Sequence, residues 1–335
     1  MPSLAQAVLA GDRLSLARLL TRVENETPEG RESLDVLFAY TGKAHLIGIT
    51  GAPGSGKSSL VNQIALSYRK LGHRVAIVAI DPSSPFTGGA VLGDRVRMRD
   101  LSGDTGVFIR SMASRGSLGG LAQATAAVVQ VFDAAGFEVI LIETVGAGQS
   151  EVDIARLAHT TIVVEAPGMG DEIQAIKAGI LEIADILVIN KADRPGVEST
   201  ERALKSMLDL AHPVPKNFPH HGQILMDTPH AAGPQDAALW IPPILRTVAT
   251  DGSGVPDLLT MILAHAAHLH NTGDWYIRER ARLSAEFDLF IQKTLVDRFH
   301  ARIPSVRIDL IMDSIQKRKI SPREAVNVLL NGSDL

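Results

Sequence analysis

Residues 48–60 constrain the fold of this chain more than any other part of the sequence, and they read GITGAPGSGKSSL. Gly51, Gly54 and Gly56 stand directly before a lysine and two serines, between an apolar run and a helical pattern. From Gly51 to Ser58 the residues match GxxxxGK(S/T) in the strand-to-helix context that this pattern requires. Glycines let backbone N–H groups converge on phosphate oxygens, and a helix N-terminus adds partial positive charge. The stretch therefore predicts a phosphate-binding loop rather than a chance glycine turn.

Two side chains of this loop are predicted to act on the phosphates. Lys57 would reach the β- and γ-phosphates and is a catalytic candidate, while the Ser58 hydroxyl would bind Mg²⁺. The loop alone does not select the base of the nucleotide. The predicted nucleotide-binding residues of the loop are Gly51, Ala52, Pro53, Gly54, Ser55, Gly56, Lys57, Ser58 and Ser59.

Short apolar, β-branched runs recur along the chain, each followed by loop residues and then a helical pattern. Near-continuous apolarity fits strands that are buried on both faces. Their alternation with helices predicts an α/β fold with a doubly wound, mostly parallel sheet. In such sheets the ligand lies beyond the carboxyl ends of the strands. The predicted strands are residues 45–50, 75–80, 139–144, 161–166, 186–191 and 243–249.

The predicted sheet belongs to a P-loop domain that is flanked by helical regions. We place this domain at residues 43–256, after an N-terminal helical extension at 1–42. Residues 257–335 read as helical to the end. A segment rich in Pro, Gly and His around residues 214–235 predicts a surface insertion without an assigned role.

Composition excludes several functional classes. The formal net charge of -4 gives no electrostatic case for nucleic acid or a membrane surface as the main partner. The chain has no cysteine, which excludes disulfides, thiolate zinc sites and cysteine nucleophiles. No run reaches the ~18 apolar residues that a membrane-spanning helix needs, and the first residues do not resemble a signal peptide. We therefore expect a cytoplasmic protein that binds neither nucleic acid nor membrane.

The sequence VINKADRP predicts the identity of the base. Asn190, Lys191 and Asp193 follow a buried strand, where a carboxylate at the guanine edge accepts from both N1–H and the N2 amine. Adenine offers no such pair of donors, so Asp193 would select GTP. Asn190 would brace the base and its loop, and the Lys191 stem would pack along the ring. The four-residue pattern is weak alone and becomes strong after a phosphate loop.

Carboxylates near the predicted strand ends are candidates for the metal site, because Mg²⁺ is a hard ion that prefers oxygen ligands. Asp81 is the first choice and would act through water. Asp94 is the second, with capping of the following helix as its alternative role. With Ser58, these residues and Glu143 form the predicted metal site.

Glu143 also opens a predicted catalytic segment, ETVGAGQSEVD. Glu143 ends a strand, and the Gly146 N–H can meet the γ-phosphate, so both join Lys57 as catalytic candidates. No glutamine directly follows Gly146, and a role for the nearby Gln149 in positioning water is left open. We expect slow intrinsic hydrolysis that rises when a partner orders these loops.

These motifs together resemble one family, the methylmalonyl-CoA mutase-associated GTPases of the MeaB and ArgK type. The resemblance runs from about residue 5 to 270 and implies a P-loop GTPase of the SIMIBI class that binds GTP or GDP with Mg²⁺. It further implies a homodimer, with the C-terminal helices as its dimerisation arm. The implied partner is a cobalamin-dependent acyl-CoA mutase. The GTPase would gate adenosylcobalamin loading and protect or reactivate the mutase. The residues that carry the resemblance are GITGAPGSGKSSL, DPSSPFTGGAVLGDRVRM, ETVGAGQSEVD, PGMGDEIQAIKAGILEIADILVINKAD and PPILRTVA.

The resemblance also implies roles for single residues. It supports the phosphate loop, the carboxylates Asp81, Asp94 and Glu143, and the base motif. It adds a third switch loop and a nucleotide-binding segment after the last predicted strand. The residues of these two segments are Asp171, Glu172, Lys177, Thr247, Val248 and Ala249.

Three other functions compete with this interpretation. A nickel-type GTPase metallochaperone would use histidines, but His265 and His268 share one helix face without His270, and scattered exposed histidines are common. An ATP-driven transport component or a protein kinase conflicts with the NKAD motif and with the absence of HRDxxxxN. A nucleotide-gated scaffold with negligible turnover stays open.

Overall fold

The computed structural model of the chain divides into two compact units, Met1–Arg282 and Leu283–Leu335. The predicted domain boundaries at residues 42 and 256 remain predictions. The residues that the structure describes are 3–82, 98–101, 103–114, 120–144, 156–168, 183–211 and 239–331.

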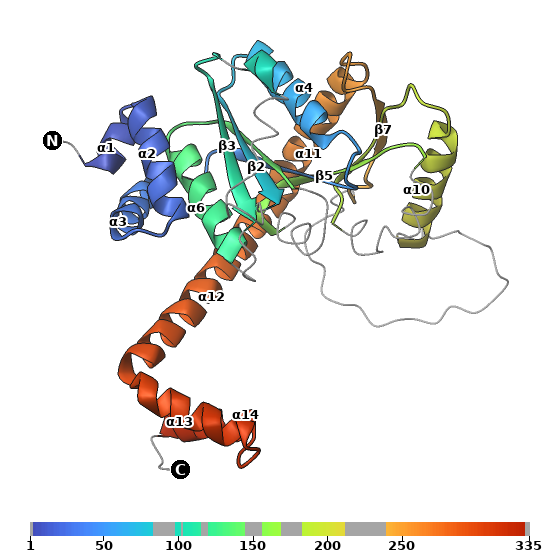
Figure 1. The fold of residues 1–335 in the computed structure, drawn as a ribbon. Coiled ribbons are helices and arrows are strands. Elements are labelled where there is room, and N and C mark those ends of the chain that lie inside the picture. The colour runs from blue at the N-terminus through green and yellow to red at the C-terminus, as the bar shows by residue number, and fades with distance from the viewer. Residues whose placement is uncertain are drawn as a thin grey trace, which may run out of the picture. The chain divides into compact units, whose positions relative to one another are not determined.

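A seven-stranded sheet forms the centre of the first unit, in the order β3-β2-β4-β1-β5-β6-β7 (Figure 1). Every pairing between neighbouring strands in this order is parallel. The predicted α/β class with a doubly wound sheet is therefore confirmed. The strands are β1 (His45–Thr50), β2 (Val75–Pro82), β3 (Val107–Ser114), β4 (Val139–Glu143), β5 (Thr160–Glu165), β6 (Ile186–Asn190) and β7 (Ile244–Thr247).

Strand β3 is the one strand of this sheet that the sequence patterns missed. It lies at the edge of the sheet, next to β2. Arg110 and Ser111 interrupt its apolar residues, so it lacks the continuous run that marks the strands buried on both faces.

Helices cover both faces of the sheet. Successive side chains of a strand point to opposite faces, and in the central strands the side chains on both faces are buried. Leu46 and Ile140 pack with α1, α2 and α6 on one face, and Ile47 and Leu141 pack with α4 and α11 on the other. On the face of Leu46, α10 packs over Leu187 at the β6 end. These helices are α1 (Leu4–Leu9), α2 (Arg13–Glu24), α3 (Pro28–Leu37), α4 (Lys57–Lys70), α6 (Gly120–Ala134), α10 (Val197–Ala211) and α11 (Val255–Thr272).

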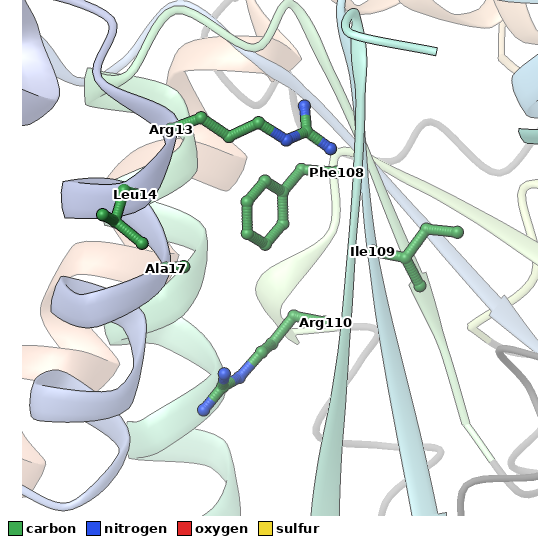
Figure 2. Close-up of a pocket in the computed structure, with 6 residues that line it drawn as sticks. All are labelled: Arg13, Leu14, Ala17, Phe108, Ile109 and Arg110. Carbon is green, nitrogen blue, oxygen red and sulfur yellow. The ribbon is translucent and has the colours of Figure 1, made fainter. Parts of the chain in front are cut away.

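The N-terminal extension packs against the edge of the sheet through α2. Arg13 crosses from α2 to β3, where its guanidinium lies over the Phe108 ring and donates to the Val107 carbonyl at 2.7 Å. The first turns of α2 and residues 108–110 of β3 line a pocket between them (Figure 2). Arg110 at this pocket pairs with Glu24 of α2. These contacts fix the extension to the domain that carries the phosphate loop.

The second unit is helical. It contains the later part of α12 (Asp274–Arg302), together with α13 (Ser305–Gln316) and α14 (Pro322–Asn331). Across the described ranges, none of the helices combines the length and the apolar character that crossing a bilayer requires.

Candidate nucleotide site

The predicted phosphate loop follows β1 directly, and its first glycine is required by the backbone. Gly51 has a φ of +132°, a backbone conformation that residues with a side chain rarely adopt. A Cβ built on Gly51 would lie 2.0 Å from the Val164 carbonyl oxygen of β5. The chain therefore leaves the sheet at a point where only glycine lets β1 and β5 stay in register.

The loop ends at the N-terminus of α4 without a side-chain cap. Gly56 is the N-cap, with a φ of 92°. The first N–H groups of α4 consequently have no capping side chain, which is the arrangement that anion sites at helix N-termini use. Lys57 is buried, and its Nζ donates to the carbonyls of Gly51 at 2.8 Å and Ala52 at 2.9 Å. The ammonium group is thus held inside the loop where the predicted phosphates would lie.

Two predicted metal-site residues from distant parts of the chain meet beside this loop. Ser58 Oγ, in the first turn of α4, donates to Glu143 Oε1 at the end of β4 at 2.6 Å. Both side chains are buried. Hydroxyl and carboxylate oxygens are suitable ligands for Mg²⁺, so the two groups fit the predicted ion.

The predicted base motif is joined to the phosphate loop by one side chain. Asn190 Nδ2 donates to the Ser55 carbonyl at 2.8 Å. Its Oδ1 accepts from the Ala249 N–H at 3.0 Å and from Thr247 Oγ1 at 3.2 Å. A Cβ on Gly56 would lie 2.4 Å from Asn190 Nδ2, so the glycine is needed for this approach. The sequence indicated a bracing role for Asn190 but not this connection.

The other residues of the base motif lie around the same loop. Lys191 Nζ donates to the Gly54 carbonyl at 2.6 Å, and Asp193 is exposed. Val248 forms an isolated bridge with Ser253, which closes the loop after β7. The segment 247–249 borders the base motif through the bonds of Thr247 and Ala249 to Asn190, and its role in nucleotide binding stays a prediction.

Several predicted residues cannot be placed. Asp81 lies at the end of β2, where only its backbone is described. The remaining predictions in this group fall outside the described residues, namely Asp94, Gly146, Gln149, Asp171, Glu172, Lys177 and the insertion at 214–235.

A polar cluster that the sequence did not predict lies around Asp185, at the amino-terminal ends of β5 and β6, whereas the phosphate loop and the base motif follow the carboxyl ends of the strands. The Asp185 carboxylate accepts from the Thr161 N–H at 2.8 Å and from two Arg278 nitrogens at 2.8 Å each. Its backbone carbonyl accepts from Trp240 Nε1 at 2.8 Å. Burial raises the pKa of Asp185, but hydrogen bonds with His265 and Arg278 outweigh this effect and lower it. One carboxylate thereby ties β5 and the start of β6 to α12.

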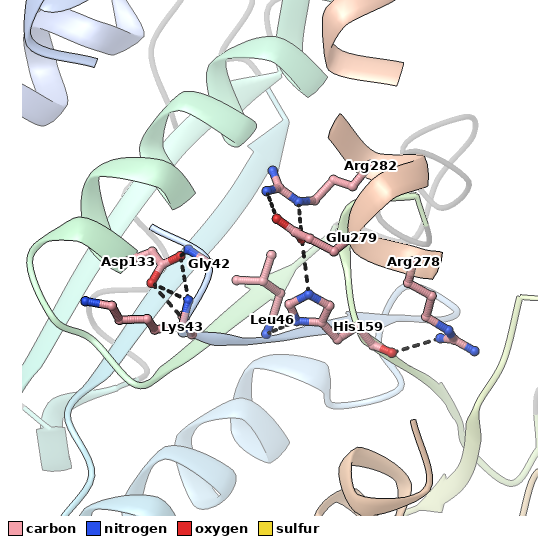
Figure 3. Close-up of polar contacts among 9 residues, drawn as sticks. Gly42, Lys43, Leu46, Asp133, His159, Arg278, Glu279 and Arg282 are labelled. Atoms are coloured by element: carbon pink, nitrogen blue, oxygen red, sulfur yellow. Dashed lines mark hydrogen bonds and ion pairs between the residues drawn. The ribbon is translucent and has the colours of Figure 1, made fainter. Parts of the chain in front are cut away.

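His159 is joined to the same cluster by Arg278, which bonds both the His159 carbonyl and Asp185, and Figure 3 shows the contacts of His159. Its Nδ1 accepts from the Leu46 N–H at 3.1 Å, and its Nε2 lies 3.4 Å from Glu279 Oε2. Arg282 holds Glu279, and Arg278 donates to the His159 carbonyl at 2.8 Å. The first turns of α12 are therefore bonded to the amino ends of β1 and β5.

The expectation of exposed histidines is wrong for His265. This residue is fully buried, with Nδ1 2.9 Å from Thr160 Oγ1 and Nε2 3.3 Å from Asp185 Oδ1. The Trp240 ring packs against the His265 ring, with the two ring centroids 4.8 Å apart. Within the described ranges, no group of three His, Cys, Asp or Glu side chains could hold a metal ion. His265 therefore acts as a polar core residue, for which helical spacing alone gives no signal.

His45 adjoins this cluster, with its Nε2 2.8 Å from Thr160 Oγ1, and it predicts a loss of stability in mild acid. Burial, with further contributions from His159, His265 and His270, lowers the pKa of His45 to about 3. Because the folded-state pKa lies below the unfolded value, neutral His45 favours folding fully above about pH 6.5, and this advantage is lost as the pH falls toward 3. We expect a slope of about 1.4 kcal/mol per pH unit from this group over that window. Urea unfolding between pH 7 and 4 measures it.

The matched variant for this prediction is His45→Gln, which keeps a polar group near Thr160 but cannot titrate. The free energy of unfolding of this variant should fall less steeply with decreasing pH than that of the natural protein. The difference in slope should be at most that of one proton, about 1.4 kcal/mol per pH unit. The other acidic and imidazole groups are present in both proteins, so the difference between the two pH curves measures the effect of His45. Parallel pH curves for the two proteins would contradict the assignment.

Comparisons with known proteins identify the family and the fold of this chain. Residues 16–303 match the family model described as methylmalonyl Co-A mutase-associated GTPase MeaB. A Pyrococcus abyssi protein named as an inferred GTPase is 42% identical over 327 residues, covering 98% of this chain and 95% of its own length. The mouse mitochondrial homolog of methylmalonic aciduria type A is 28% identical over 339 residues, covering 96% of this chain and 77% of its own. A crystal structure of an LAO/AO transport system kinase matches with a TM-score of 0.68 at 23% identity, covering 98% of this chain and 95% of its own, and shares the fold.

Proposed function

The chain belongs to the family of methylmalonyl-CoA mutase-associated GTPases, and from this premise we propose that it is a GTP-dependent chaperone of a cobalamin-dependent acyl-CoA mutase. That it is a GTPase follows from the family and the P-loop fold. The observation that carries the proposal is the Asn190 side chain, which bonds both the phosphate loop and the loop after β7. Phosphate and base segments thus form one site whose order can depend on the bound nucleotide.

In this mechanism, the chain's own groups neutralise and orient the phosphates. The N-terminus of α4 and the Lys57 ammonium would face the anion, and the Gly51 and Ala52 carbonyls hold the ammonium in the loop. Ser58 and Glu143 would hold Mg²⁺, which would neutralise charge on the β- and γ-oxygens when bound. We assign the predicted Asp81, Asp94 and Gly146 to the same region, as the loops after β2 and β4 start there.

GTP loading and hydrolysis would change the order of the loops around the phosphates, and this order would be the signal to the mutase. The family name supports association with methylmalonyl-CoA mutase. The proposed outcome is gated loading of adenosylcobalamin and protection or reactivation of the mutase. We place this activity in the cytoplasm, without nucleic acid or membrane as partner.

The test is the GTP hydrolysis rate of the purified protein with Mg²⁺, alone and with a cobalamin-dependent acyl-CoA mutase from the same source, with ATP as the control. We expect slow, GTP-specific hydrolysis that the mutase accelerates. A rate unchanged by the mutase, together with no association between the proteins, would contradict the chaperone role. Single-turnover measurements separate this result from a scaffold with negligible turnover.

Guanine selection gives a separate prediction for Asp193. The change Asp193→Asn replaces two acceptor oxygens by an amide whose N–H can pair with the C2 carbonyl of xanthine. A hydrogen bond to a charged group contributes about 1.5 to 3 kcal/mol, so GTP affinity should fall by about 10- to 100-fold while XTP affinity rises. Competition binding measures both. Asp257→Asn in the first turn of α11 is the control, and equal behaviour of the two variants would contradict the role of Asp193.

We further propose that the protein is a homodimer and that the second unit of each chain forms the interface. Phe287, Ile291 and Leu295 are exposed and follow each other at four-residue spacing, so they share one face of α12. None of the α12 residues is buried within the chain. Exposed apolar stripes of this kind are typical of protein interfaces.

Light scattering tests this dimer. The double variant Phe287→Asp and Leu295→Asp should be a monomer at concentrations where the natural protein is a dimer, because both charges would be buried without partners. Phe38→Asp, at an exposed apolar residue of the first unit, should leave the dimer intact. A natural protein that is monomeric at tens of micromolar would contradict the proposal.

A further inference from the structure

Strands β1 and β4 stay paired up to the point where each enters the nucleotide site. Their parallel register ends with Ile49 opposite Glu143. The Thr144 N–H then donates to the Ile49 carbonyl at 3.1 Å. The pairing therefore extends one residue beyond Glu143, and Thr144 is the last residue after β4 that the structure describes before residue 156.

Two hydroxyl groups close this pairing from inside the core. Thr144 Oγ1 donates to Thr50 Oγ1 at 3.0 Å, and both side chains are completely or almost completely buried. The residues before them on β1 and β4 are mostly isoleucine and leucine. Valine has nearly the shape of threonine and would be buried without the cost of desolvating a hydroxyl. The hydroxyl pair is therefore not explained by the packing of the core.

The position of the pair suggests its role. Thr50 directly precedes Gly51, where the phosphate loop begins, and Thr144 directly follows Glu143. Glu143 Oε1 accepts from Ser58 Oγ at 2.6 Å, on the helix that the same loop starts. The hydroxyl bond thus connects the strand that carries the carboxylate to the strand that carries the loop. It lies one residue from each of these two functional groups.

We propose that Thr144, held by Thr50, is a positioning residue that keeps the Glu143 carboxylate at Ser58 and thereby sets the affinity of the nucleotide site for Mg²⁺. Residues that hold metal ligands in place commonly change metal affinity by 10- to 100-fold when they are replaced. Without the hydroxyl bond, the end of β4 can rotate or shift while the rest of the β1 and β4 pairing remains. This inference rests on the proposed GTPase site, because it assigns the metal to Ser58 and Glu143.

The test uses binding of a fluorescent GDP analogue at increasing Mg²⁺ concentration, with thermal unfolding as a second readout. We expect Thr144→Val to raise the Mg²⁺ concentration for half-maximal binding by about tenfold. Thr144→Ser keeps the hydroxyl, so its Mg²⁺ concentration for half-maximal binding should equal that of the natural protein. Thr50→Val removes the acceptor from the other strand and should reproduce the effect of Thr144→Val, so the test survives if one variant fails to fold.

The outcomes separate this inference from the proposed function. A natural protein that does not bind the analogue with Mg²⁺ would overturn the proposed GTPase site itself. If the natural protein binds but the valine variants need no more Mg²⁺ than it does, the positioning role is wrong. A Thr144→Ser variant that behaves like Thr144→Val also overturns it, because the hydroxyl would then not matter. A lower melting temperature without a change in Mg²⁺ dependence identifies a purely structural bond.

Discussion

Replacing Lys57 by alanine is expected to lower single-turnover GTP hydrolysis by about 10²- to 10³-fold, the usual cost of removing one preorganised charge-stabilising donor. The ammonium group already lies inside the loop, bonded to the Gly51 and Ala52 carbonyls. It therefore needs little reorganisation to meet the phosphates. Rapid-quench hydrolysis with excess protein measures the loss, and binding of a fluorescent GTP analogue shows how much of it arises before the chemical step.

The matched control is Lys70→Ala, at the exposed last residue of the same helix α4. This change also removes one positive charge from α4, but more than 15 Å from Lys57 along a helix that rises about 1.5 Å per residue. GTP hydrolysis should be unchanged in Lys70→Ala. Normal hydrolysis in Lys57→Ala, or an equal loss in both variants, would overturn the assigned role of Lys57.

The sequence predicted the sheet and the phosphate loop because both depend on local patterns. Residues 46–49 of β1 and 186–189 of β6 form continuous apolar runs, since both faces of these strands are covered by helices. Gly51 and Gly56 both have positive φ angles, and a Cβ on either would collide with a neighbour, the Val164 carbonyl or the Asn190 side chain. The glycine spacing therefore carried the prediction.

Features that depend on contacts between distant segments were not predictable in this way. Edge strand β3 carries polar residues, and one of them, Arg110, pairs with Glu24 of α2, a contact that no local pattern indicates. His265 follows the helical pattern of α11, and nothing in that pattern indicates that Asp185 lies beside it in the fold. The Thr50 and Thr144 hydroxyls read as ordinary strand-end residues until the two strands are placed side by side.

The Asp185 cluster gives the largest expected effect on stability. Asp185→Ala would leave the Thr161 N–H without its acceptor and Arg278 without its carboxylate. Breaking a buried ion pair by removing one partner costs about 3 to 5 kcal/mol. The Arg278 side chain is 36% exposed, so solvent screens part of the loss. We therefore expect about 2 to 4 kcal/mol.

Urea unfolding of the natural protein and three variants measures this effect. Asp185→Asn keeps an acceptor for the Thr161 N–H and should lose less stability than Asp185→Ala. Glu201→Ala is the control, because it breaks ion pairs with Arg246 and Lys205, which are 46% and 61% exposed, and should cost less than about 1 kcal/mol. Hydrogen exchange should also show faster opening of the first turns of α12 in the Asp185 variants alone, since the bond between Arg278 and Asp185 is one of their connections to β5 and β6. If Asp185→Ala costs no more than Glu201→Ala, the cluster does not hold α12 to the sheet.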